Sequence, residues 1–309
     1  MLVVEYIKPK SRRKDMKTHN SICSFLSMVL LIVFCNASAG EYVRINPDLE
    51  LYYVEAGTGT PMIFIPGWCG TTEFFEKYQI PHFSKNYRVI SYDPRSQGRS
   101  SKTLENNNYT QHGKDLRAFM ETLELKDVIL VGHSAGCHDI YAYLREYGTD
   151  NVKSCIFIDY MPRPIAAEKD DWAEFSDAME VGDFINAIIY DFRGLLTAFI
   201  PTFIQRKMTK EEFDWIFDEI LKTPTYAAAL SAVDVSFADY TAEAQMIDGN
   251  IPVLNVVSEW REGWAESAQT LLAKNAPNSE IFVLGKHLMF FEFPKEFNAE
   301  VDAFLTKSK

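Results

Sequence analysis

A serine between small residues is the first feature of this sequence that could do chemistry. The stretch Gly132-His133-Ser134-Ala135-Gly136 follows the apolar run Val128 to Val131 and precedes a helical pattern. A serine at a sharp strand-to-helix turn exposes its hydroxyl beside a helix N-terminus, and small neighbours let the chain turn that tightly. We therefore expect Ser134 to be a nucleophile rather than an ordinary turn serine.

A serine hydroxyl needs a base that is largely neutral at neutral pH, and histidine is the side chain that meets this need. Of the six histidines, His287 alone comes late in the chain, just past the last predicted strand. We expect it to be the general base. The other five lie earlier, in a leader, on early loops or helix starts, or at the serine turn: His19, His82, His112, His133 and His138.

Short apolar runs alternate with longer amphipathic stretches after residue 40, a pattern typical of βα units on a mostly parallel sheet. The predicted strands are Leu51 to Val54, Met62 to Ile65, Tyr87 to Tyr92, Val128 to Val131, Ser154 to Ile158, Val253 to Val257 and Glu280 to Val283. The predicted helices are Gly113 to Leu123, Ala135 to Tyr147, Trp264 to Lys274 and Pro294 to Thr306.

The alternation stops between Pro162 and Asn250, where only helical periodicity is found, for example from Met208 to Leu221. We interpret residues 162–250 as a helical cap. The cap divides an α/β core into residues 40–161 and 251–309.

Together these features resemble the α/β-hydrolase superfamily, over essentially all of residues 41–309. Three further stretches carry the resemblance: Ile65-Pro66-Gly67-Trp68-Cys69-Gly70, Tyr92-Asp93-Pro94-Arg95-Ser96-Gln97-Gly98-Arg99-Ser100, and His287-Leu288-Met289-Phe290-Phe291-Glu292-Phe293-Pro294. The implied fold is a mostly parallel sheet flanked by helices, with an inserted helical cap. The resemblance also implies that the backbone N–H groups of Trp68 and Ala135 form an oxyanion hole, as two fixed donors can.

The third catalytic group departs from the usual pattern of that family. Most relatives carry an aspartate after the strand that follows the cap, where this chain has Arg261. Two carboxylates remain candidates: Asp159, at the end of the strand before the cap, and Glu259. Some branches of the superfamily place their acid after that earlier strand, so we favour Asp159 and keep Glu259 as the alternative. Trp68 and Tyr160 are candidate substrate contacts.

The first 39 residues have the form of an export signal. Basic residues precede an apolar stretch from Ile22 to Cys35, and the small residues Ala37-Ser38-Ala39 predict cleavage before Gly40. The apolar stretch is shorter than the roughly 20 residues of a membrane span, so we expect a periplasmic or secreted protein without a membrane anchor after cleavage.

The protein is acidic, with a formal charge of −12 that becomes −16 without residues 1–39. Such a surface repels phosphate backbones, which argues against nucleic acid as a partner. After the leader only Cys69, Cys137 and Cys155 remain, without metal-type spacing. We expect these three cysteines to be small buried hydrophobic residues, with one disulfide between two of them as the alternative. We expect neither a metal nor a cofactor.

The leading functional hypothesis is hydrolysis of a small-molecule carboxylic ester, lactone or thioester through an acyl-enzyme on Ser134. A peptidase of the proline-iminopeptidase type is an alternative, with Glu168, Asp170 and Asp171 as candidate ligands of a free amine. A binding protein that lost turnover is the second. Haloperoxidase-like relatives usually carry Met where Ala135 stands.

Overall fold

The computed structural model of the protein describes residues 40–165 and 172–308. The predicted export signal, residues 1–39, lies outside this part of the chain. The acids Glu168, Asp170 and Asp171, which were candidate ligands of an amine, also lie outside it.

One sheet of eight strands forms the centre of the described chain, in the order β1-β2-β4-β3-β5-β6-β7-β8. The strands β1 and β2 pair antiparallel, β2 also runs antiparallel to β4, and every later pairing is parallel. The central strands are buried on both faces, which explains their nearly continuous apolar sequences. The strands are β1 Glu41–Asn46, β2 Leu49–Ala56, β3 Pro61–Ile65, β4 Arg88–Tyr92, β5 Val128–His133, β6 Val152–Ile158, β7 Val253–Val257 and β8 Glu280–Val283.

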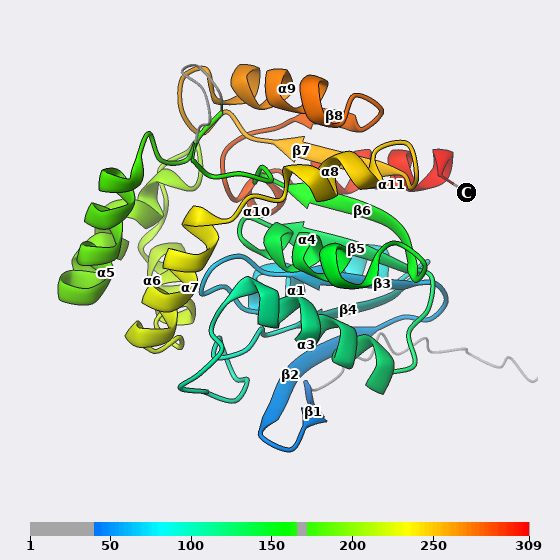
Figure 1. The fold of residues 1–309 in the computed structure, drawn as a ribbon, viewed down its shortest axis with the longest axis horizontal. Helices are drawn as coiled ribbons and strands as arrows, with labels where there is room; N and C mark the ends of the chain where they lie inside the picture. The colour runs from blue at the N-terminus through cyan, green and yellow to red at the C-terminus, as the bar shows by residue number, and fades with distance from the viewer. Residues whose placement is uncertain (1–39, 166–171, 309) are drawn as a thin grey trace, which may run out of the picture. The chain divides into compact units, whose positions relative to one another are not determined.

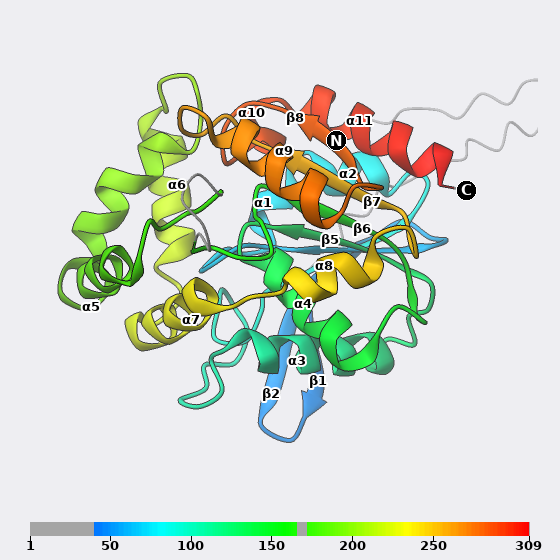
Figure 2. The same ribbon diagram turned by 45° about the horizontal axis from the view of Figure 1, so that its top comes forward.

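Helices cover both faces of this sheet (Figures 1 and 2). Helices α3, α4, α8 and α9 lie on one face, whereas α2 and α11 lie on the other. The bounds are α1 Glu73–Glu76, α2 Gln79–Phe83, α3 Tyr109–Thr122, α4 Gly136–Tyr147, α8 Thr241–Ile247, α9 Trp264–Asn275, α10 Met289–Glu292 and α11 Pro294–Lys307. This arrangement agrees with the predicted fold class.

Further helices stand between β6 and β7, beyond one end of the sheet, on the left in Figure 1. Local capping sets their ends: the Asp177 carboxylate accepts from the first-turn N–H groups of α5, and Thr209 and Glu212 form a reciprocal capping box on α6. These elements are α5 Ala178–Phe199, the 3₁₀ turn η1 Ile200–Thr202, α6 Lys210–Ile220 and α7 Thr225–Phe237.

Among the described helices, the stretch Ala178–Thr202 is long and apolar enough to cross a membrane, judged by length and composition alone. Some of its apolar side chains contact the rest of the protein. Phe184, Leu196 and Phe199 line a cavity near the end of the sheet, and α5 packs along α7. We therefore describe it as a helix that covers this cavity.

Two of the differences between the predicted elements and the structure have a clear physical cause. Strand β1 was not predicted, because it is a mostly exposed edge strand with an alternating polar sequence rather than an apolar run. Helix α3 begins at Tyr109 rather than at the predicted Gly113, since the Asn108 side chain caps it by accepting from the Gln111 N–H. The three cysteines Cys69, Cys137 and Cys155 are buried free thiols, so the alternative of one disulfide among them is not observed.

Candidate active site

The serine turn lies between β5 and α4, as its sequence predicted. Ser134 has a φ of 52°, a left-handed conformation that is costly for a residue with a side chain. Glycines on both sides make this turn possible: a Cβ on Gly132 would lie 2.6 Å from the Gly136 carbonyl oxygen, and one on Gly136 would lie 2.5 Å from the Ile65 carbonyl oxygen. The backbone is thus packed too closely here for any larger residue.

The loop after β3 packs directly against this serine. A Cβ on Gly67 would lie 2.8 Å from the Ser134 Cβ and 3.3 Å from its Oγ. The next residue, Trp68, donates its indole N–H to the Ala228 carbonyl of α7 at 2.8 Å. The same loop therefore contacts the serine on one side and the covering helices on the other.

The backbone N–H groups of Trp68 and Ala135 are the predicted oxyanion donors. Among the hydrogen bonds of the described loops and helix caps, neither group donates to a protein acceptor. Ala135 also occupies the N-cap position of α4, where backbone N–H groups and the helix dipole favour negative charge. Both residues line the cavity that contains Ser134.

His287 is held by Asp159, the favoured candidate for the acid. The imidazole Nδ1 lies 2.6 Å from Asp159 Oδ2, and both side chains are buried. Asp159 follows β6 and has a φ of 55°. The alternative acid, Glu259, is exposed, and its backbone N–H donates to the Gly285 carbonyl. The structure thus places Asp159, not Glu259, on the histidine.

The second oxygen of Asp159 is fixed by two other donors. Oδ1 accepts from the Ser258 backbone N–H at 3.0 Å and from the Trp264 indole N–H at 3.3 Å. Burial alone would raise the pKa of the Asp159 carboxyl, but the hydrogen bond and charge of His287 and the bonds from Ser258 outweigh it and lower that pKa. The carboxylate is therefore ionised and oriented at neutral pH.

Aromatic rings surround the imidazole of His287. Trp260 stacks on it at 4.6 Å between ring centroids, with an angle of 23° between the planes, and the Phe203 ring lies 5.3 Å away. Trp260 belongs to the loop after β7, where most relatives in the resembled family carry their acid. In this chain that loop supplies rings and backbone donors, while the acid comes from β6.

His133 is a part of this site whose role the sequence analysis did not foresee. Its Nε2 lies 3.0 Å from the His287 carbonyl oxygen, so Nε2 carries the proton and donates. Burial, and secondly the charge of His287, lower the pKa of His133 to about 3. A neutral imidazole next to the serine thus holds the backbone of the candidate base. Its position inside the serine motif was the one available signal.

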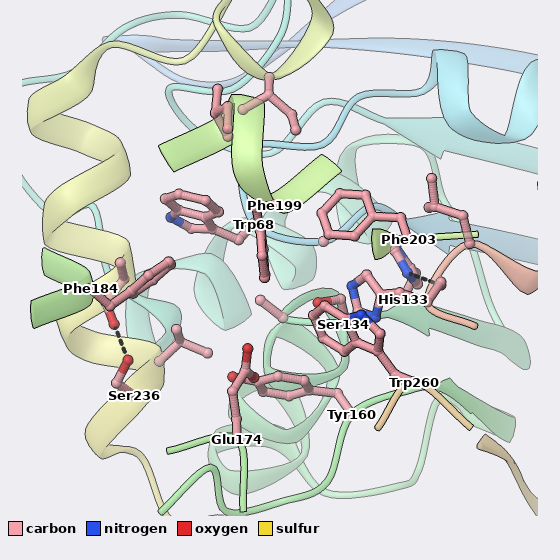
Figure 3. A pocket seen from close by; sticks show the side chains of 18 of the residues that line it. Trp68, His133, Ser134, Tyr160, Glu174, Phe184, Phe199, Phe203, Ser236 and Trp260 are labelled. Atoms are coloured by element: carbon pink, nitrogen blue, oxygen red, sulfur yellow. Dashed lines mark hydrogen bonds between the residues drawn. The ribbon is translucent and has the colours of Figure 1, made fainter. Parts of the chain in front are cut away.

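A small, partly open cavity of about 60 Å³ is lined by these groups (Figure 3). Ser134 and His287 both line it, together with the predicted substrate contacts Trp68 and Tyr160. Most of its wall is apolar, from α5, α7 and the loop after β7. Among the described residues, no group of three or more His, Cys, Asp or Glu side chains could hold a metal ion.

Comparison with known proteins places this chain in a family. The family model of the alpha/beta hydrolase fold matches residues 60–219, about half of the chain. The chain belongs to the α/β-hydrolase family. It is therefore a hydrolase of that family, with neighbours named as esterases and as haloperoxidases.

Three relatives illustrate these neighbours of the α/β-hydrolase chain. The structure of a bromoperoxidase from Bacillus anthracis matches with a TM-score of 0.79 and 27% identity, over 87% of this chain and 100% of that one. An esterase from Exiguobacterium antarcticum matches in fold with a TM-score of 0.78 and 20% identity, over 86% and 99% of the two chains.

The third relative is a protein of Synechocystis sp. that is provisionally named a non-heme chloroperoxidase. It is 29% identical over 166 residues, which are 52% of this chain and 60% of that relative. The match thus spans less than two thirds of the length of that relative.

Proposed function

We propose that this α/β hydrolase is a serine esterase, which cleaves a carboxylic ester, lactone or thioester through an acyl-enzyme on Ser134. The observation that supports this most is the meeting of three features at one cavity: the strained Ser134 turn, the 2.6 Å contact of His287 with Asp159, and two uncommitted backbone donors. No one of these features alone would call for this chemistry.

The proposed reaction follows from the protonation of His287. Because Nδ1–H donates to Asp159, Nε2 is the nitrogen left to accept the Ser134 proton. Ser134 Oγ then attacks the carbonyl carbon, and the N–H groups of Trp68 and Ala135 stabilise the oxygen that becomes negative. The imidazolium returns its proton to the departing alcohol or thiol. Water, activated by the same His287, hydrolyses the acyl-enzyme.

The size of the cavity favours a short acyl group. An apolar cavity of about 150 Å³ is known to accept benzene, and this one measures about 60 Å³. The walls include Trp68, Phe184 and Phe199. We expect kcat/KM to be highest for p-nitrophenyl esters of two to four carbons and to fall for octanoate, measured across a chain-length panel.

A fluorophosphonate probe tests the serine mechanism directly, because only an activated serine is labelled quickly. Ser134→Ala should abolish labelling and lower kcat by several orders of magnitude with the fold retained. Ser236→Ala is the matched control: Ser236 also lines the cavity, but its hydroxyl donates to the Ala232 carbonyl. Labelling that survives in Ser134→Ala would overturn the proposal.

Acyl transfer to hydrogen peroxide is a second candidate, favoured by the bromoperoxidase that this chain matches along that protein's whole length. The same acyl-enzyme would give a peracid in place of an acid. Ala135 argues against it as the main activity, because haloperoxidase-like relatives usually carry Met there. Peracid formation that competes with hydrolysis at millimolar peroxide would favour this candidate over simple hydrolysis.

Export to the periplasm or the medium remains part of the proposal, motivated by the charged and apolar leader. N-terminal sequencing of protein from the native host should give Gly40 or a neighbouring residue. An uncleaved chain in the cytoplasm or the membrane fraction would contradict export as a soluble enzyme.

A further inference from the structure

The cavity contains a carboxyl group that the proposed mechanism does not use. Among the described residues that line it, Glu174 brings the one carboxylate, in a wall made mostly of aromatic and aliphatic side chains. An ionisable group in apolar surroundings costs free energy unless it is hydrogen-bonded or paired. The position of Glu174 therefore needs a physical account.

The backbone of Glu174 is fixed from both sides. Its N–H donates to the Pro164 carbonyl at 2.8 Å, and its own carbonyl accepts from Arg261 Nη1 at 3.1 Å. Arg261 is the cation that stands where most family members have their acid, and its guanidinium also lies over the rings of Trp260 and Trp264. The loop after β7 thus holds Glu174 in place.

The side chain of Glu174 points into the cavity, with Tyr160 beside it and Ser134 facing the same space (Figure 3). Both Tyr160 and Glu174 belong to the wall of the cavity that contains Ser134. A carboxylate can accept about four hydrogen bonds, so the Glu174 carboxyl can accept from a donor group of a bound substrate.

Burial raises the pKa of the Glu174 carboxyl, and this effect exceeds the opposing effects of His287, Tyr160 and Arg261. The raised pKa means that the apolar surroundings do not fully satisfy the charge. A donor from a bound substrate would satisfy it.

We propose that Glu174, beside Tyr160 in the cavity wall, selects substrates that carry an O–H or N–H donor close to the carbonyl that Ser134 attacks. The substrate class would be short hydroxyacyl or aminoacyl esters. This inference rests on the proposed esterase function and adds its substrate class. A site with a buried acceptor discriminates against an analogue that lacks the donor, because the acceptor is then left unpaired.

Three p-nitrophenyl esters of matched shape test the inference: 3-hydroxybutyrate, 3-aminobutyrate and 3-methylbutyrate. They differ only in the group at the branch, which is a hydroxyl, an ammonium or a methyl. For the wild-type protein we expect kcat/KM to be at least about tenfold higher for one of the two donor esters than for the methyl ester. Equal or lower values for both donor esters would overturn the inference.

Two substitutions assign the preference to Glu174 and identify the donor. Glu174→Leu should bring the ratio of donor to methyl ester down to about one or less. Glu174→Gln keeps an acceptor but loses the charge, so it should keep much of a hydroxyl preference and lose an ammonium preference. If the ratio of kcat/KM between donor and methyl ester is unchanged in Glu174→Leu, another group binds the donor and the assignment to Glu174 is refuted.

Controls separate this inference from the proposed function. Glu262→Gln removes an exposed negative charge from the loop after β7 and should leave the wild-type ratio unchanged. Fluorophosphonate labelling of Ser134 should persist in Glu174→Leu, which shows that this variant is folded. Labelling and methyl-ester hydrolysis without a donor preference would overturn only the selection by Glu174. If the wild-type protein is not labelled and hydrolyses none of the esters, both proposals are overturned.

Discussion

Replacing Asp159 by asparagine is the sharpest test of how His287 is oriented. An asparagine amide has one oxygen and one NH₂ group, and the two positions it must fill are not equivalent. The Oδ1 position faces two donors, the Ser258 N–H and the Trp264 indole N–H. The asparagine oxygen therefore stays there, since the reverse orientation would set NH₂ against both donors.

In that orientation the NH₂ group faces His287 Nδ1 at the place where Oδ2 lies 2.6 Å away in the native protein. Nδ1 must then accept, so the ring proton moves to Nε2, which is the nitrogen that should take the Ser134 proton. A wrong tautomer of this kind costs up to about 10⁴ in kcat. At about 1.36 kcal/mol for each tenfold change, this loss raises the barrier by about 5.4 kcal/mol.

The assay compares kcat on p-nitrophenyl acetate, the rate of fluorophosphonate labelling and the melting temperature. The bonds at Oδ1 survive in Asp159→Asn, so we expect a folded protein that labels and turns over slowly. Glu259→Gln is the matched control and should keep wild-type kcat, because Glu259 is exposed. The reasoning fails if the kcat of Asp159→Asn stays within tenfold of the wild-type value, or if Glu259→Gln loses most of its kcat.

Two further predictions concern the serine turn and the buried histidine of α4. Gly67→Ala would place a methyl 2.8 Å from the Ser134 Cβ, and a displaced nucleophile should cost about 10² in kcat. Gly182→Ala, with open space at its Cβ, should cost nothing, so equal kcat in both variants would contradict the packing argument. Burial lowers the pKa of His138 to about 3. Below about pH 6.5, His138 is therefore protonated in the unfolded chain but stays neutral in the folded protein. Wild type should then lose about 1.4 kcal/mol of unfolding free energy per pH unit relative to His138→Gln, down to about pH 4. Urea titrations from pH 7 to 4 measure this difference, and a difference that is independent of pH would contradict the buried neutral state.

Much of the fold could be predicted because it depends on local sequence. The buried strands β3, β5 and β7 are apolar runs bounded by turn residues, and such runs can be recognised without tertiary information. Strand β1 has no such run. It exists because β2 offers it a pairing edge, and a pairing edge belongs to the sheet, not to the segment.

The serine turn was equally local. Gly132, Ser134 and Gly136 lie within five residues, and the close packing of the two glycines is what the spacing of the motif encodes. His287 could be proposed because few histidines were available and only one of them came late. The sequence by itself therefore determined the nucleophile and the base as candidates, and the strands that precede them.

The sequence could not decide between Asp159 and Glu259, because that choice depends on which carboxylate reaches a histidine 128 positions away from Asp159. Only the tertiary structure placed β6 and the His287 loop together. It also brought the His133 ring under the His287 backbone and the Trp260 ring onto the imidazole. It also directed the Glu174 side chain into a cavity whose other walls come from helices distant in the sequence. Contacts of this kind are set by the packing of whole elements, and neither composition nor spacing along the chain specifies them.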